Sequence, residues 1–186
     1  MSKTTAQSNT RQREIRNLLE KIVVNTGVGR LSQQPNFQDK GLASLKQDLA
    51  AVTGQQPQVR PAKKSIAGFK LREGQIVGLR VTLRDKKMVD FFERLITIVM
   101  PRVHDFRGIS LDALDKGGSL NIGFREQFVF PELSAEESQL TFPLGVNLVP
   151  REKDRAKALE AYRKLGVPLM KDGTETPAKK RRKKKQ

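Results

Sequence analysis

The chain of 186 residues contains no cysteine, no tryptophan, one tyrosine and one histidine. Without cysteine it can form no disulfide, no thiolate nucleophile and no cysteine-based metal site. The single histidine, His104, has no second metal ligand and no candidate nucleophile beside it. We therefore expect neither a metal nor a cofactor, and the residues that mark most catalytic centres are missing.

Long apolar segments are missing as well. No stretch approaches the roughly 18 apolar residues that cross a membrane. The N-terminal sequence MSKTTAQSNTRQREIRN lacks the apolar centre of a signal peptide. These absences predict a cytoplasmic protein without a membrane partner.

Acidic residues are scarce relative to basic ones. The chain has 36 Lys and Arg against 20 Asp and Glu, a net charge of +16, and a pI near 10.4. The terminal run Lys179–Lys185 supplies seven of the cations, which leaves 29 cations against 20 acids in the rest of the chain. The body is therefore basic by itself, which is typical of nucleic-acid-binding domains.

The composition divides the chain into three parts. Residues 1–14 are polar with nothing to bury, so we expect a disordered leader. Residues 15–170 are long enough for one domain with a real core. Residues 171–186 form a basic tail that we expect to be disordered.

Apolar spacing predicts three helices. They cover about residues 42–52, 88–99 and 151–165, with Gly54 as the C-cap of the first. Pro101 should stop the second helix. The third should use three residues for packing, namely Ala156, Leu159 and Tyr162.

Strands are predicted at residues 22–24 and 76–83 and in the segments SLNIGF, QFVF and TFPLGVNLV. Partial alternation in the strand of residues 76–83 should bury Val77, Leu79, Val81 and Leu83 and leave Arg80, Thr82 and Arg84 on the other face. The mixed order predicts a two-layer α+β domain, with helices packed on one face of a mostly antiparallel sheet. The other sheet face should remain free.

The segment RPAKKSIAGFKLREG, residues 60–74, concentrates positive charge. It carries five cations, one acid and one aromatic, Phe69, without a helical or strand period. We interpret it as a mobile loop that attracts phosphates. Phe69 is either a core anchor or an exposed platform on which a base could stack.

Three further motifs leave alternatives open. Gly27 and Gly29 resemble the start of a dinucleotide-binding loop, but Ser32 occupies the third glycine position, which favours a simple turn. In PRVHDFRG, Phe106 should be core, and Arg102 and Arg107 either pair with Asp105 or reach a nucleic acid. The tail is a solvated charge run, a nonspecific phosphate contact or a nuclear-import signal.

Four blocks resemble a known family, the bacterial-type large-subunit ribosomal protein five, which binds 5S ribosomal RNA. The blocks are KIVVNTGVG, LAAVTGQQPQVRPAKKSIAGFKLREG, GLRVTLRDKKMVDFFERLITIVMPRVHDFRG and LNIGFREQFVFPEL. The resemblance spans about Leu19 to Val167. It implies a structural, non-enzymatic protein of the central protuberance, where it helps attach 5S rRNA to 23S rRNA.

The resemblance also implies particular residues. Those expected to contact 5S rRNA are Asn25, Gln55, Thr82 and Arg84. Those expected to reach peptidyl-site transfer RNA are Lys63, Lys64, Ser65, Gly68, Phe69 and Lys70. Nonspecific phosphate contacts are expected from Arg60, Arg72, Arg80, Lys180, Arg181 and Arg182.

Further implied partners are neighbouring proteins of the central protuberance, with the small-subunit head as an additional candidate. The sequence departs from the family pattern at His104, where the family has arginine, and in SAEESQLTFPLGVNLVP. Two other classes compete with this interpretation. A general basic nucleic-acid-binding protein fits the charge, whereas a nucleic-acid enzyme would need a carboxylate cluster that the scattered acids do not supply.

Overall fold

The computed structural model describes residues 2–29, 31–33, 37, 41–134, 138 and 140–170, with only the backbone for residues 2–9. At its centre five strands form one antiparallel sheet in the order β2-β3-β1-β5-β4. Their bounds are Leu19–Gly27 (β1), Gln58–Pro61 (β2), Ile76–Leu83 (β3), Leu120–Phe124 (β4) and Leu144–Pro150 (β5). The strand predicted at residues 76–83 is therefore confirmed.

Burial alternates along the strands, so only one face of the sheet meets the core. On β1, Ile22 and Val24 are fully buried, and they pair with Leu83 and Val81 of β3. The buried residues of β4 and β5 continue the same face, since Ile122 pairs with Val146. The residues that alternate with these buried ones along each strand form the second face of the sheet, which we call the open face.

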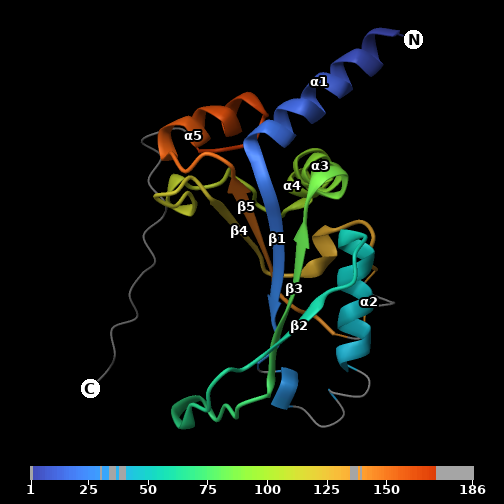
Figure 1. Cartoon of the computed structure of the whole chain (residues 1–186). Helices are drawn as coiled ribbons and strands as arrows, with labels where there is room; N and C mark the ends of the chain where they lie inside the picture. Colours follow the sequence, from blue (N-terminus) through green and yellow to red (C-terminus); the bar gives the residue numbers. More distant parts are fainter. Residues whose placement is uncertain are drawn as a thin grey trace.

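Helices lie beside the sheet. They are α1 (Ser2–Leu18), α2 (Leu42–Thr53), α3 (Asp85–Arg94) and α5 (Arg155–Lys164), and α3 continues through a π-helical turn (Leu95–Val99) into α4 (Met100–Arg102). In Figure 1, α2 and α3 lie on the same side of the sheet, and α1 projects from the end where β1 begins. Apolar residues of the helices and strands form one cluster. The predicted α+β class is confirmed.

Tyr162 ties α5 to the sheet. Its ring is fully buried, and its hydroxyl donates to the carbonyls of Gly118 at 3.1 Å and Leu148 at 3.3 Å. A buried phenol needs such partners, and burial raises the pKa of Tyr162 far above its usual value. Gly118 has a φ of +78°, and a Cβ there would lie 2.7 Å from the Cβ of Ala158. Glycine therefore permits the close approach of α5.

The N-terminal segment, for which the sequence predicts a disordered leader at residues 1–14, is part of α1, which begins at Ser2. The segment has no glycine or proline to end a helix. The helix is anchored by the fully buried Ile15, and it extends from there through this segment toward the N-terminus. The division into leader, domain and tail stays a prediction, and residues 171–186 lie outside the described residues.

The segment QFVF is not a strand, so that prediction is wrong. Gln127–Val129 form a 3-10 turn. The fully buried amide of Gln127 donates to Leu140 O at 2.6 Å and accepts from Phe142 N at 2.9 Å. A single side chain therefore supplies the hydrogen bonds that a strand backbone would make.

Two helix details also differ. Helical structure passes Pro101 and ends after Arg102, one residue later than Pro101. The last helix begins at Arg155, since the Asp154 side chain accepts from the backbone N–H of Ala156 and of Lys157. Ala158 is buried, while Ala156 is exposed.

Candidate nucleic-acid interface

The open face carries polar side chains and glycines in two rows across the sheet. In one row Thr82 and Asn147 flank Val23, and Asn121 pairs with Asn147. The second row runs through five strands: Gln58, Arg80, Asn25, Gly145 and Gly123. Core packing covers neither row, so hydrogen-bonding groups stand at the fixed spacing of a sheet.

Three asparagines in these rows are hydrogen-bonded in series. Asn25 Nδ2 donates to Asn147 Oδ1 at 2.7 Å. Asn147 Nδ2 donates to Asn121 Oδ1, and Asn121 Nδ2 donates to the backbone carbonyl of Ala113 at 3.4 Å. We call Asn25, Asn147 and Asn121 the asparagine relay. Because it crosses β1, β5 and β4, it occupies much of the open face.

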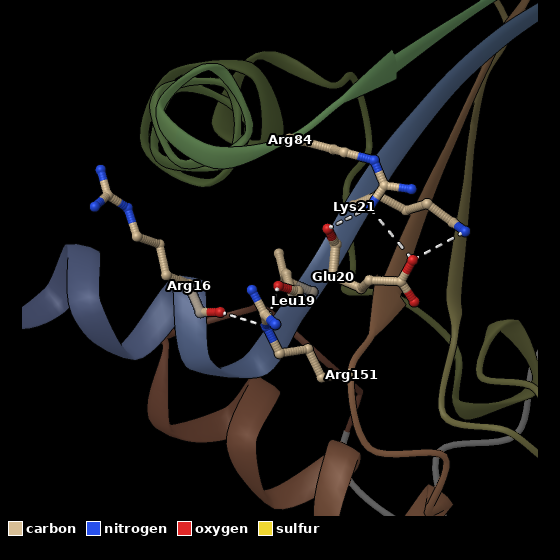
Figure 2. A network of polar contacts seen from close by, with 6 residues as sticks. All are labelled: Arg16, Leu19, Glu20, Lys21, Arg84 and Arg151. Atoms are coloured by element: carbon tan, nitrogen blue, oxygen red, sulfur yellow. Dashed lines mark hydrogen bonds and ion pairs between the residues drawn. The ribbon is translucent and has the colours of Figure 1, made fainter.

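Negative charge is nearly absent from the sheet. Glu20 is the one acidic residue within the five strands, and it lies at the end where β1 begins. Its carboxylate binds Lys21 at 3.2 Å and Arg84 at 3.3 Å, as Figure 2 shows. The hydrogen bond and charge of Lys21, followed by those of Arg84, lower the pKa of Glu20. A polyanion would therefore meet little repulsion on this sheet.

Arg84 marks the end of the open face where β1 begins. Besides the carboxylate of Glu20, its guanidinium contacts the Glu20 carbonyl at 3.4 Å, yet its side chain remains 52% exposed. In the same view Arg151 Nε donates to the carbonyls of Arg16 at 2.9 Å and Leu19 at 3.2 Å. Arg151 therefore fixes the junction of α1 and β1, next to Glu20.

Gln55 and Thr82 meet at the edge of the sheet beside β2. Gly54 ends α2 in the left-handed conformation with φ of 66°, and the chain then places Gln55 Nε2 3.4 Å from Thr82 O. Thr82 and Asn25 lie on neighbouring strands of the open face. The structure thus brings Asn25, Gln55 and Thr82 into one region, with Arg84 at its end.

The basic loop, residues 62–75, extends beyond the opposite end of the sheet (Figure 1). It is an ordered hairpin, since Ala62 N donates to Gln75 O at 2.8 Å and Ile66 pairs with Leu71 in both directions. Glu73 N donates to the hydroxyl of Ser65 at 2.9 Å. Lys70 ends a 3-10 turn with φ of 52°. The structure thus gives the loop two hydrogen-bonded arms, where the sequence showed no regular period.

Exposed side chains cover the loop tip. Every residue from Lys63 to Lys70 is exposed, and Phe69 reaches 76% exposure. The alternative that Phe69 anchors the core is therefore wrong. Arg72 is exposed in the loop, Arg60 lies on β2 and Arg80 on β3. Lys180, Arg181 and Arg182 lie outside the described residues.

Metal-binding groups and the single histidine were both candidates for chemistry. In the described part of the chain, no group of three or more His, Asp or Glu side chains could hold a metal ion. His104 pairs with Asp105 at 3.3 Å, but the two side chains are 96% and 89% exposed.

Phe106 is partly buried and packs against the core. None of the helices at the described positions is both long and apolar enough to span a bilayer.

Sequence reasoning missed Asn147 and Asn121. The segments that contain them, LNIGF in β4 and LGVNLV in β5, do carry a usable signal, which is the alternation of buried apolar residues with Asn or Gly. The alternation predicts that each Asn faces away from the core. It does not predict which residues of other strands they meet.

Comparison with known proteins identifies the family. Residues 17–72 match the family Ribosomal protein L5, and residues 76–169 match the C-terminus of the same ribosomal family. Large ribosomal subunit protein uL5 of Rubrobacter xylanophilus is 48% identical over 151 residues, which cover 81% of this chain and 82% of that protein. The protein of the same name from Chlorobaculum tepidum is 45% identical over 153 residues, 82% of this chain and 81% of its own. From these matches, the chain belongs to the ribosomal protein L5 family.

Proposed function

We propose that the chain is a structural protein of the large ribosomal subunit that binds 5S rRNA through its open face. The L5 family is structural and not enzymatic. The observation that carries the proposal is a sheet face with hydrogen-bonding side chains, glycines and Arg80, on strands whose only acid is paired. Amide and hydroxyl groups on such a face can bind ribose hydroxyls and base edges, while arginine binds phosphate.

A second contact is proposed for the basic loop. Lys63, Lys64 and Lys70 are exposed on the same loop as the exposed ring of Phe69, which suits peptidyl-site tRNA. Phosphate contacts by flexible lysines are strong enough to attract a tRNA and loose enough to release it. The hairpin lies beyond one end of the sheet, opposite the end where β1 begins (Figure 1). One molecule could therefore hold 5S rRNA and touch tRNA at once.

The remaining partners follow from the same assignment. We propose that the chain helps attach 5S rRNA to 23S rRNA in the central protuberance, next to other ribosomal proteins and facing the small-subunit head. It would act in the cytoplasm, bound to ribosomes. The uL5 relatives support the large subunit as its place.

Filter binding tests the function. At about 150 mM salt, the protein should bind 5S rRNA more tightly than an RNA duplex of equal length. Thr82→Ala should weaken 5S rRNA binding by about 1–3 kcal/mol, because none of the described residues hydrogen-bonds the Thr82 hydroxyl, which is therefore available to RNA.

Thr97→Ala is the matched control. Thr97 is exposed in the helical layer, where its hydroxyl donates to Glu93 O at 2.7 Å, so its loss should leave RNA affinity unchanged. Equal affinity of the unaltered protein for 5S rRNA and the duplex would refute specific recognition. It would instead favour a general basic nucleic-acid-binding protein.

A further inference from the structure

The asparagine relay has a direction, and that direction is fixed at one end. The carbonyl of Ala113 can only accept a hydrogen bond, so Asn121 must turn its NH₂ group toward it. Asn121 then offers its oxygen to Asn147, and Asn147 in turn offers its oxygen to Asn25. The carboxamide of Asn25 is thereby held with Nδ2 toward β5, and its oxygen, Oδ1, makes no hydrogen bond within the relay.

The oxygen of Asn25 is free to bind something else. Among the described residues no donor hydrogen-bonds Asn25 Oδ1. Asn25 is only partly buried on the open face. A carbonyl oxygen in this position accepts hydrogen bonds and cannot donate them.

Gly145 supplies the room for this arrangement. It lies directly opposite Asn25 in the register of β1 and β5, while Asn147 lies one step diagonally. A Cβ at Gly145 would stand 2.6 Å from Asn25 Oδ1, far inside contact distance. The Asn25 side chain can therefore lean across β5 to Asn147 only because residue 145 has no side chain.

We propose that Asn147 and Gly145 are positioning residues that orient Asn25, so that the open face presents a hydrogen-bond acceptor to a donor group of RNA. Ribose 2′-hydroxyls and the exocyclic amine of guanine are the donors that such an oxygen would select. The 2′-hydroxyl would also distinguish RNA from DNA. This inference rests on the proposed RNA-binding function of the open face.

A double-mutant cycle on 5S rRNA binding tests the roles of both residues. Asn147→Ala and Gly145→Ala should each weaken binding about three- to tenfold, the effect of one misplaced hydrogen bond. Neither should weaken it further in an Asn25→Ala background, because both act through Asn25. Gly123→Ala is the matched control: it lies in the same row with open space around its Cβ, so any effect of it should add to that of Asn25→Ala.

Two further measurements separate this proposal from the function itself. In nitrogen-15 spectra of the free protein, Asn147→Ala and Gly145→Ala should shift the side-chain amide signals of Asn25, whereas Gly123→Ala should not. The second measurement uses 5S rRNA transcripts with scattered 2′-deoxy or inosine substitutions. A substitution that weakens binding of the unaltered protein should no longer weaken binding of the Asn147→Ala protein. The two substitutions distinguish a ribose hydroxyl from a guanine amine.

The proposal is overturned if Asn147→Ala leaves the Asn25 signals in place. It is also overturned if Asn147→Ala still weakens binding in the Asn25→Ala background. A third contrary result is that every donor-removing substitution in the RNA affects the unaltered protein and Asn147→Ala equally. Because the spectra need no RNA, the relay can fail while 5S rRNA binding stands. The reverse also holds, since a protein that does not prefer 5S rRNA could still show the relay.

Discussion

Replacing Lys63, Lys64 and Lys70 together by glutamine should weaken tRNA binding about 100-fold at about 150 mM salt. Each lysine that contacts a phosphate displaces about 0.7–0.9 of a counterion. Loss of three contacts therefore lowers the slope of log affinity against log salt by about two to three units. The three side chains are exposed in an ordered hairpin, so the fold should not change.

Filter binding of tRNA over a series of salt concentrations measures both the affinity and the slope. The matched control removes the same charge elsewhere, at the exposed Lys116, Lys153 and Lys164, and should change the tRNA slope far less. The loop variant should also retain most of its affinity for 5S rRNA, because the loop lies away from the open face. Equal losses in the loop and control variants would contradict a loop-specific contact.

Phe130→Ala should lower the free energy of unfolding by about 3–5 kcal/mol, the range for truncating a buried phenylalanine. The ring is 2% exposed. It stacks on Phe91 of α3 with centroids 6.1 Å apart and meets Phe124 of β4 edge-on at 5.6 Å. Phe130 therefore joins the helical layer to the outer strand that carries Asn121.

Urea unfolding measures this change, with Phe69→Ala as its control. Phe69 is 76% exposed at the loop tip, so the same substitution there should alter the unfolding free energy by less than about 0.5 kcal/mol. A small loss at Phe130 would mean that β4 is held in place by other contacts. A large loss at Phe69 would mean that the loop packs against the core.

The sequence predicted those parts of the fold that depend on local periodicity. The alternation in residues 76–83 located β3 and its buried face, and the spacing of Leu45, Leu49 and Val52 located α2 with Gly54 as its cap. Residues 2–14 carry no apolar stripe, so periodicity could not indicate α1, whose buried anchor, Ile15, lies near its C-terminal end. The segment QFVF was misjudged because Gln127 binds a backbone 13 residues away along the chain.

The candidate site was predictable only in part. Asn25, Gln55, Thr82 and Arg84 were expected from the family resemblance, and alternation alone placed Thr82 and Arg84 away from the core. The relay depends on the registers of β1 with β5 and of β5 with β4, where Asn25 and Asn147 are 122 residues apart. Such registers are set by tertiary packing, which periodicity within one segment does not encode.

The most direct test of the central claim is photo-crosslinking from the open face, with sequencing of the RNA recovered from sedimented ribosomal particles. A photoreactive residue fits at Gly123, where a Cβ has open space, and a control fits at Ile98, which is 42% exposed in the helical layer. We predict crosslinks to 5S rRNA from position 123 and none from position 98. Crosslinks from position 98 alone, or from position 123 to unrelated RNAs without 5S rRNA, would contradict an open face that binds 5S rRNA.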